Sequence, residues 1–93
     1  MNEVDVFKAL GDQTRLKILE CVKNGEKCIC EIIPYTKKSQ PNVSQHLKIL
    51  KNAHIIAVRK EGTKIMIQVS NDEIYNIIEQ VKKKERDKKE KAE

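Results

Sequence analysis

Residues 39–53 constrain the fold more than any other segment of this 93-residue chain. Ser39 is a favoured N-cap residue, and Pro41 falls in the first helical turn, where its missing N–H costs little. Apolar side chains then recur at i, i+4 and i+7, which places them on one stripe of a helix: Val43, Leu47 and Leu50. The segment therefore predicts a short helix, the reading helix, that buries one face and exposes the other.

The exposed face of the reading helix differs from an ordinary soluble surface. It carries Ser44, Gln45, Lys48 and Asn52, which are uncharged hydrogen-bonding groups together with one cation. This is the mixture of groups that base edges and phosphates require. A helix that only needed to be soluble would more often carry Glu and Lys. We therefore expect this face to lie in a groove of DNA.

The net charge of +5 is concentrated around the same helix. Residues 37–64 hold seven Lys and Arg side chains against Glu61 alone, whereas residues 1–36 and 65–81 are net acidic. A basic patch confined to one segment is typical of a protein that binds nucleic acid. A generic soluble surface would distribute its cations more evenly.

The size of the chain fits one domain, near the lower limit for a well-filled core. No apolar run approaches the roughly 20 residues that cross a bilayer, and the N-terminal residues do not resemble a signal peptide. Three cysteines without a secretion signal indicate reduced thiols. We therefore expect a cytoplasmic protein with no membrane partner.

Three shorter helices are predicted before the reading helix. Gly11 separates residues 3–10 from a second helix over residues 13–23, which Asp12 caps. A third helix begins near Cys28, and it is followed by a turn over residues 35–38. The first helix carries Val4, Phe7 and Leu10 on one side, and the side chains expected to be buried in the second are Leu16, Ile18, Leu19 and Val22.

The third helix is short, because Pro34 limits it to a turn or two. The reading helix follows directly after the turn. Two helices joined by a tight turn, the second one polar on its outer side, form a helix-turn-helix motif.

After Ala53 the apolar period changes from 3.6 to 2, which predicts a β-hairpin. Residues 56–60 and 65–69 alternate on either side of a turn at Glu61 and Gly62. The tip of this hairpin is basic, with Arg59, Lys60 and Lys64.

A last helix begins after Asn71 or Asp72, with an apolar stripe of Ile74, Ile77, Ile78 and Val81. Residues 82–93 are almost wholly charged and cannot bury a face, so we expect a frayed helix extension or a disordered tail. The predicted organisation is one DNA-binding and dimerisation domain over residues 1–81, followed by this tail.

The predicted fold is mainly α-helical with a small β-hairpin. It is a winged helix-turn-helix with extra helices at both ends. Those two terminal helices carry apolar stripes that have no evident partner within the chain. A domain this small gains stability by association, so we expect these helices to dimerise.

Four segments resemble the ArsR/SmtB family of winged-helix repressors: residues 7–19, 25–32, 39–47 and 59–63. The combination of Leu-Gly-Asp-x-Thr-Arg with Ser-Gln-x-x-Val-Ser-x-His-Leu is far more specific than a helix-turn-helix pattern alone. The resemblance covers residues 4–81. It implies a homodimer joined through its first and last helices, with the reading helix in the major groove and the hairpin as a wing. Many members of this family release DNA when metal binds.

The predicted function is a sequence-specific transcriptional repressor that binds a double-stranded DNA operator. The side chains expected at the DNA are Ser39, Gln40, Asn42, Ser44, Gln45 and Lys48 on the reading helix, and Arg59, Lys60 and Lys64 on the wing. An enzyme is not expected, because the sequence shows no Ser/His/Asp set, glycine-rich phosphate loop or paired carboxylates in a plausible cleft.

Cys28 and Cys30 match the cysteine pair that begins the third helix in arsenic-sensing members of the family. Soft thiolates favour As(III), Cd(II) or Zn(II), and a helix N-terminus lowers the pKa of a thiol. The arsenic-sensing pattern often adds a third cysteine where this chain has Ile33. The cysteine or histidine arm of cadmium sensors and the last-helix histidines of zinc sensors are absent. Cys21 is the remaining thiol, and it equally fits a small core residue.

Three interpretations of the cysteine pair remain open. The pair binds As(III), Cd(II) or Zn(II) as an inducer, it senses thiol redox state, or it is silent. None of them requires a cofactor for DNA binding. Residues two apart lie on different sides of a regular helix, so joint chelation by Cys28 and Cys30 predicts an unwound helix start.

The two histidines receive different interpretations. His46 lies at the edge of the buried stripe of the reading helix, and we interpret it as a boundary residue that holds the motif together. His54 stands just before the hairpin, where the family often has glycine, and the sequence predicts no role for it.

Overall fold

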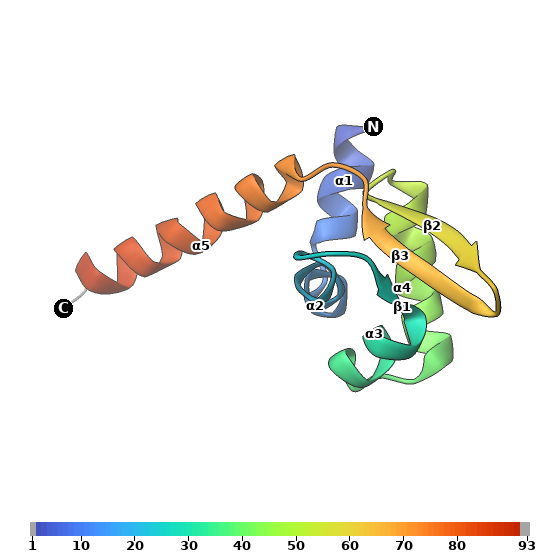
Figure 1. Cartoon of the computed structure of the whole chain (residues 1–93). Coiled ribbons are helices and arrows are strands. Elements are labelled where there is room, and N and C mark those ends of the chain that lie inside the picture. The colour runs from blue at the N-terminus through green and yellow to red at the C-terminus, as the bar shows by residue number, and fades with distance from the viewer. Residues whose placement is uncertain (1, 92–93) are drawn as a thin grey trace.

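The computed structural model describes the backbone of residues 2–91 and the side chains of residues 2–86. Over this part of the chain, five helices and a three-stranded sheet form a winged helix-turn-helix with a further helix at each end (Figure 1). The elements follow in the order α1 (Glu3–Leu10), α2 (Gln13–Cys21), β1 (Lys27–Cys28), α3 (Ile29–Thr36), α4 (Gln40–Asn52), β2 (Ile56–Glu61), β3 (Lys64–Val69) and α5 (Glu73–Lys91). The predicted fold class is confirmed.

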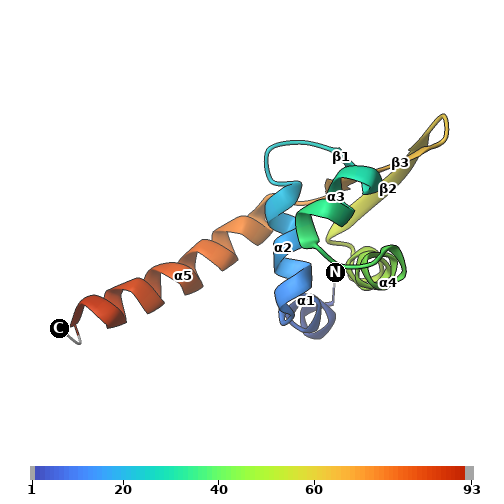
Figure 2. The same ribbon diagram turned by 90° about the horizontal axis from the view of Figure 1, so that it is seen from below.

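One core joins the helices to the sheet. The buried stripe of α4 packs against α1, α2, α3 and β2, so the reading helix touches most of the domain. Figure 2 shows α4 beneath the hairpin, with α1 and α2 to one side of it. The largest fully buried side chains come from every layer: Ile18, Leu19, Val22, Ile32, Val43, Leu50, Ile55 and Ile67. Burial of each such side chain contributes about 1.5–3 kcal/mol.

The helix starts are capped where the sequence predicts caps. Asp12 Oδ2 accepts the N–H of Arg15 at 3.0 Å, and Ser39 Oγ accepts the N–H of Asn42 at 3.3 Å. Of the two candidates before α5, Asn71 accepts a bond of 2.9 Å from the helix start. These bonds satisfy N–H groups that have no partner within the helix.

The sheet contains a strand that the sequence does not predict. β1 pairs with β3 in an antiparallel manner, and the strand order is β1-β3-β2. A strand of two residues is too short to show an alternation of apolar and polar residues, which is the pattern that predicts the hairpin. As a result Cys28, Met66 and Arg59 lie side by side in one row across the three strands.

The apolar side that the sequence marks on α1 is largely exposed. Val6 and Ala9 are buried, whereas Val4 and Phe7 are 56% and 60% exposed. Leu16 of α2, also expected inside, is 38% exposed. The exposure of Val4 and Phe7 agrees with an apolar terminal helix that has no partner within the chain. The prediction that Leu16 is buried is wrong, because the sequence does not say which apolar stripe of α2 meets the body of the same chain.

The turn before the reading helix is shorter than predicted. α3 continues through Thr36, with Pro34 inside it, so only the last part of residues 35–38 forms the turn. The helix ends at Lys37, which has the left-handed φ of 60°.

His54 closes α4 with its backbone. Its φ is +61°, its N–H donates to the carbonyl of Lys51 at 3.0 Å, and the N–H of Ile55 donates to that of Leu50 at 3.0 Å. This is the Schellman arrangement, which places a left-handed residue just after the helix and favours glycine there. The role of His54 is therefore to end the reading helix, in a conformation that a side chain makes less favourable.

α5 projects away from the body of the domain (Figures 1 and 2). Its first turn is anchored, since Ile74 is buried and Tyr75 Oη donates to the carbonyl of Leu19 at 2.5 Å. Burial is the main reason why the pKa of Tyr75 is raised to about 12. The helix crosses the expected boundary at residues 81 and 82 and continues to Lys91, so the first part of the charged tail is helical here. Residues 92–93 lie outside the described part.

Candidate nucleic-acid interface

The predicted DNA-reading side chains all lie on the outer side of α4 or at its N-cap. Val43, Leu47 and Leu50 turn inward and are buried. The opposite side is exposed and carries Ser39, Gln40, Asn42, Ser44, Gln45 and Lys48. The burial of one stripe thus presents the polar stripe outward as a single surface.

A cleft of about 360 Å³ separates α4 from the wing, which is the hairpin of β2 and β3. Ser44 and Lys48 lie at this cleft, together with Lys51 and Asn52 of the same helix. Apolar side chains complete its lining: Ile29, Leu47, Val58, Ile65 and Ile67. The structure thus brings two of the predicted reading residues next to the wing.

A second cleft, of about 380 Å³, joins the start of α4 to the tip of the wing. Gln40 and Lys64, both predicted to contact DNA, line it from opposite sides. Cys28 and Cys30 line the same cleft. The cysteine pair is therefore adjacent to the two elements expected to bind DNA.

The three wing cations are not equivalent. Lys60 and Lys64 are exposed, and within the described residues neither is in an ion pair. Arg59 instead donates to both carboxylate oxygens of Glu26, from Nε at 2.7 Å and from Nη2 at 2.6 Å. The hydrogen bond from Arg59 lowers the pKa of Glu26, and Glu26 raises the pKa of Arg59.

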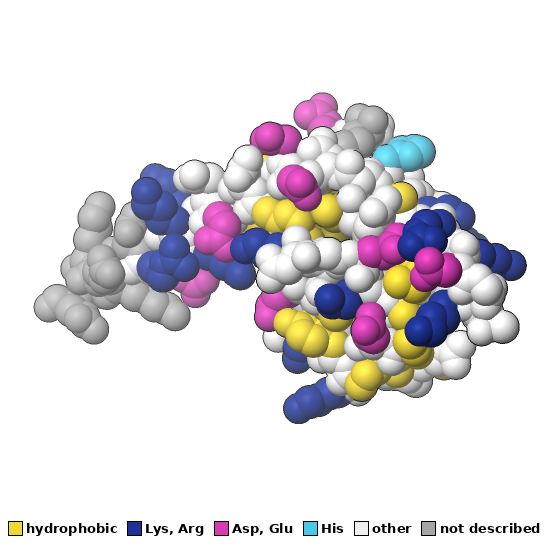
Figure 3. Space-filling model, in the orientation of Figure 1, with side chains coloured by type: hydrophobic (Ala, Val, Ile, Leu, Met, Phe, Trp, Pro, Cys, Tyr) yellow, Lys and Arg dark blue, Asp and Glu magenta, His cyan; other side chains and the backbone are white. Residues whose placement is uncertain are grey.

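Figure 3 shows where the charges gather on one face of the molecule. Lys and Arg side chains lie over the hairpin end and along α5, and the face between them carries both signs. The predicted concentration of cations around the wing is therefore visible, although acidic groups such as Glu26 and Glu61 accompany it.

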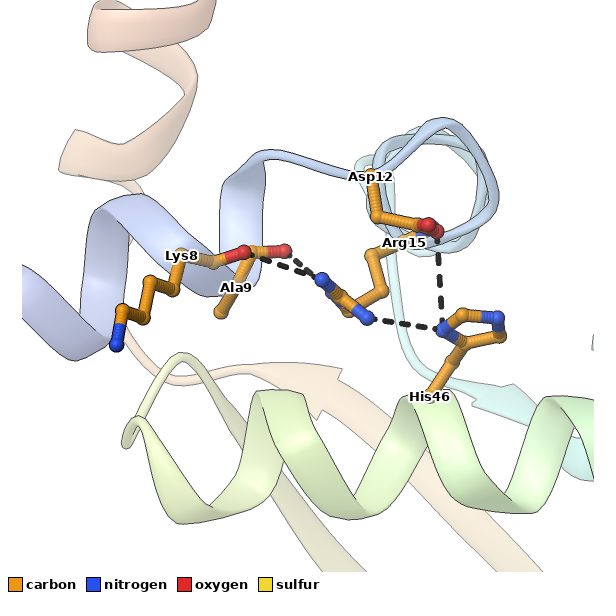
Figure 4. A network of polar contacts seen from close by, with 5 residues as sticks. All are labelled: Lys8, Ala9, Asp12, Arg15 and His46. Carbon is orange, nitrogen blue, oxygen red and sulfur yellow. Dashed lines mark hydrogen bonds and ion pairs between the residues drawn. The ribbon is translucent and has the colours of Figure 1, made fainter.

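Arg15 ties the reading helix to the first two helices (Figure 4). Its Nε donates to the carbonyl of Ala9 at 2.7 Å, and its Nη2 donates to that of Lys8 at 3.1 Å. Its Nη1 lies 3.1 Å from His46 Nδ1. An arginine side chain has no acceptor, so in this hydrogen bond Arg15 is the donor and His46 Nδ1 is the acceptor.

The same network includes the cap of α2. Asp12 Oδ2 lies 3.7 Å from His46 Nδ1, which is too far for a hydrogen bond and leaves Nδ1 to Arg15. The pKa of Asp12 is lowered, chiefly by the hydrogen bond from the backbone N–H of Arg15. The interpretation of His46 as a residue that holds the motif together agrees with these contacts.

Cys28 and Cys30 are joined by a disulfide, with their Cα atoms 5.1 Å apart, so the expectation of reduced thiols is wrong for this pair. Cys28 is the N-cap of α3, in an extended conformation, and only Cys30 lies within the helix. Glu31 completes a capping box by accepting the N–H of Cys28 at 3.0 Å. Because Cys28 precedes the helix, its sulfur meets that of Cys30 without unwinding of α3. That joint chelation of an ion would unwind the helix start stays a prediction.

Cys21 does not join this pair in the described residues. It is half-buried against the core, and burial is the main reason why the pKa of its thiol is raised. No cluster of three or more His, Cys, Asp or Glu side chains that could hold a metal ion is found in the part of the chain that the structure describes. The cysteine pair suits a thiophilic ion by ligand type, but it supplies only two of the donors that a closed site needs.

An apolar surface lies on the opposite side of the domain, and we name it the terminal-helix face. It comprises side chains from α1, α2 and α5 around a cavity of about 370 Å³. Its apolar members are Phe7, Leu10, Leu16, Ile77, Ile78 and Val81. Val81 is 66% exposed, which is unusual for a valine in the middle of a helix stripe.

Comparison with known proteins identifies the family. Residues 12–58 match the model of the bacterial regulatory proteins of the arsR family. The chain belongs to this family. It is 47% identical over 78 residues, or 83% of its length, to an HTH-type transcriptional regulator of Methanocaldococcus jannaschii, and it covers 88% of that protein.

Two further relatives extend the comparison. The chain is 37% identical over 67 residues to an arsenical resistance operon repressor of Staphylococcus xylosus, a match that covers 72% of this chain and 64% of the repressor. A homodimeric winged helix-turn-helix DNA-binding domain of Mycobacterium bovis superposes with a TM-score of 0.76 at 26% identity, over 85% of this chain and 73% of that domain.

Family membership confirms the predicted class of function, a DNA-binding transcriptional repressor with a winged helix-turn-helix fold. The family consists of regulators, so the protein is not an enzyme. Two positioning residues escaped the sequence prediction. Arg15 lies in the Leu-Gly-Asp-x-Thr-Arg motif, which signalled the family but not this role, and nothing local marks Glu26 as the partner of a wing arginine.

Arg15→Lys should lower the free energy of unfolding by about 1–3 kcal/mol, since a lysine cannot hold three acceptors in one fork. Urea unfolding followed by circular dichroism measures this loss. Lys17→Arg, the reverse exchange at an exposed position of the same helix, should change the free energy of unfolding by less than about 0.5 kcal/mol. Equal effects of the two exchanges would contradict a special role for Arg15.

Proposed function

We propose that this arsR-family protein acts as a homodimer that represses transcription from a roughly palindromic operator. The observation that carries this proposal is the geometry of α4, whose polar stripe is exposed beside a cationic wing while its apolar stripe is buried. Two copies related by a two-fold axis would present two such helices to successive major grooves, which requires inverted half-sites.

The terminal-helix face supports the dimer. α5 is anchored to the body only near its start, yet its apolar stripe continues to Val81 in solvent. An exposed apolar stripe on a small domain marks an interaction surface. A homodimeric relative of the same fold in Mycobacterium bovis favours a second copy of this chain as the partner.

Phe7→Glu and Val81→Glu should each raise the dissociation constant of the dimer by a factor of about 30, since a buried anchor is worth about 2 kcal/mol. Sedimentation equilibrium at micromolar concentration measures this. Ile49→Glu is the matched control, because Ile49 is an exposed apolar residue of α4 outside the terminal-helix face. A wild-type monomer that binds operator DNA at full affinity would rule out the dimer.

The DNA contacts divide into base recognition and phosphate binding. Gln45 lies in the middle of the polar stripe and is suited to an adenine edge, whereas Lys64 at the wing tip is suited to a phosphate. Because phosphate contacts release counterions, they set the salt dependence of binding and carry no sequence information.

Gln45→Ala should cost about 1–3 kcal/mol at one base pair per half-site and leave the salt dependence unchanged. Lys64→Gln should weaken binding to every sequence alike and reduce the slope of log affinity against log salt by about 0.9 for each phosphate that the variant no longer neutralises. Fluorescence anisotropy with operator variants at several salt concentrations separates the two effects. If both variants relax base preference equally, the assignment of these residues is wrong.

We further infer that Cys28 and Cys30 sense the inducer, which is As(III), Cd(II) or Zn(II). Their position in the second cleft, between the start of α4 and the tip of the wing, supports this, because an occupant there lies beside Gln40 and Lys64. An ion would bind the reduced, dithiol form of the pair, with Cys28 and Cys30 as thiolate ligands, and would bring positive charge to that point. The disulfide favours a second candidate, a repressor that responds to thiol oxidation.

The variant Cys28→Ser/Cys30→Ser tests whether the cysteine pair is the sensor. Wild-type protein that has first been reduced to the dithiol should lose operator affinity about 5- to 150-fold with the effective agent, since coupling of this kind is typically about 1–3 kcal/mol. The double variant should bind operator DNA normally and not respond. Titrations with As(III), Cd(II), Zn(II) and a thiol oxidant identify the agent. If only the oxidant acts, the redox candidate is correct, and if none acts, the pair is silent.

A repressor acts at the DNA, so the proposal places the protein in the cytoplasm. In the described part of the chain, no helix has both the length and the apolar composition needed to cross a bilayer.

A further inference from the structure

Arg59 is the wing cation whose geometry does not fit DNA binding. Its Nε and Nη2 both donate to the carboxylate of Glu26, and an oxygen of a second carboxylate, that of Glu61, lies 3.5 Å from Nη2. The guanidinium is therefore neutralised within the chain. A phosphate would have to displace a bidentate carboxylate, which is the arrangement that best matches the fork of an arginine.

The alternation of β2 also keeps Arg59 out of the cleft of about 360 Å³ between the wing and α4. Val58 lines the cleft between the wing and α4, and side chains next to each other on a strand point to opposite faces. Arg59 therefore lies on the face of the hairpin opposite to Val58, in one row with Met66 and Cys28 and on the same face as Lys64. Glu26 reaches this face from the segment just before β1.

We propose that Glu26 and Arg59 form a brace that positions the wing, and that Arg59 does not contact DNA. The brace joins β2 to the segment before β1, which are 33 residues apart in sequence and lie at the two edges of the sheet. This inference rests on the proposed DNA-binding function and assigns a different task to one of the residues expected at the DNA.

The brace acts where the wing is otherwise weakly held. Beyond Val58, the strand residues Arg59, Lys60 and Glu61 are exposed on both faces, so no buried side chain fixes the tip. A two-stranded ribbon without a buried face bends easily. The side chain of Glu26 is 21% exposed and that of Arg59 is 49% exposed, so the pair is partly shielded and spans the sheet without crowding the cleft.

The variant Glu26→Gln/Arg59→Gln removes the brace without changing the net charge. It should lower operator affinity about two- to fivefold, the range expected for an exposed ion pair, and leave the salt slope unchanged. Each single variant also changes the net charge by one unit, so Arg59→Gln is compared with Lys23→Gln and Glu26→Gln with Glu79→Gln. Relative to its control, each single variant should lose no more operator affinity than the double variant. Thermal unfolding of each variant checks that the fold is retained.

The charge-exchanged variant Glu26→Arg/Arg59→Glu is decisive. The brace is restored in reverse, so operator affinity and salt slope should return to within about twofold of wild type. If Arg59 binds a phosphate, a glutamate there would instead lower affinity more than tenfold and reduce the slope by about 0.9 for each phosphate left without its cation.

Lys64→Gln serves as the positive control in the same titration, because its loss should reduce the salt slope. Failure of wild-type protein to bind duplex DNA would overturn the proposed function itself. Loss of binding in the charge-exchanged variant, with normal wild-type binding, would overturn only the brace.

Discussion

The burial of one stripe of α4 is the interaction on which the rest of the structure depends. Val43, Leu47 and Leu50 fill the space between α2, α3 and the sheet, and they leave no freedom for the helix to rotate. Because the stripe on the opposite side is polar, fixing the apolar stripe also fixes which side chains reach solvent. Ile55 and Ile67 belong to the same core, so the wing is held against α4 by the contacts that hold α4 itself.

The parts of the fold with a regular apolar period could be predicted from the sequence. The 3.6 period of α4 and the period of 2 in the hairpin each specify an element and its buried face. Phe7 shows where this reasoning ends, since its stripe is apolar but faces away from the chain's own core. A stripe indicates burial and does not say whether the covering surface belongs to the same chain. β1 has two residues and therefore no period to detect.

The candidate site was predictable residue by residue on α4 and only partly on the wing. On a helix the polar stripe follows from the buried stripe, so the exposed positions of Ser44, Gln45 and Lys48 require no further information. On the wing, the role of a cation depends on what stands opposite it. Arg59 and Lys64 look alike in sequence, but Glu26 lies 33 residues from Arg59 and no local pattern pairs them. Long-range ion pairs leave no periodic signal, so composition alone assigns both cations to DNA.

Cys28 lies next to both of the elements that are expected to bind DNA. Cys28 caps α3, pairs with Met66 of β3 and borders the cleft that Gln40 and Lys64 also line. A change at its sulfur therefore acts on the start of α4 and on the wing at once, with no intervening layer of side chains. The brace adds a second connection, because Glu26 lies two residues before Cys28 and holds Arg59. A displacement of β1 would therefore act on β3 through the backbone pairing of the two strands and on β2 through the ion pair of Glu26 with Arg59.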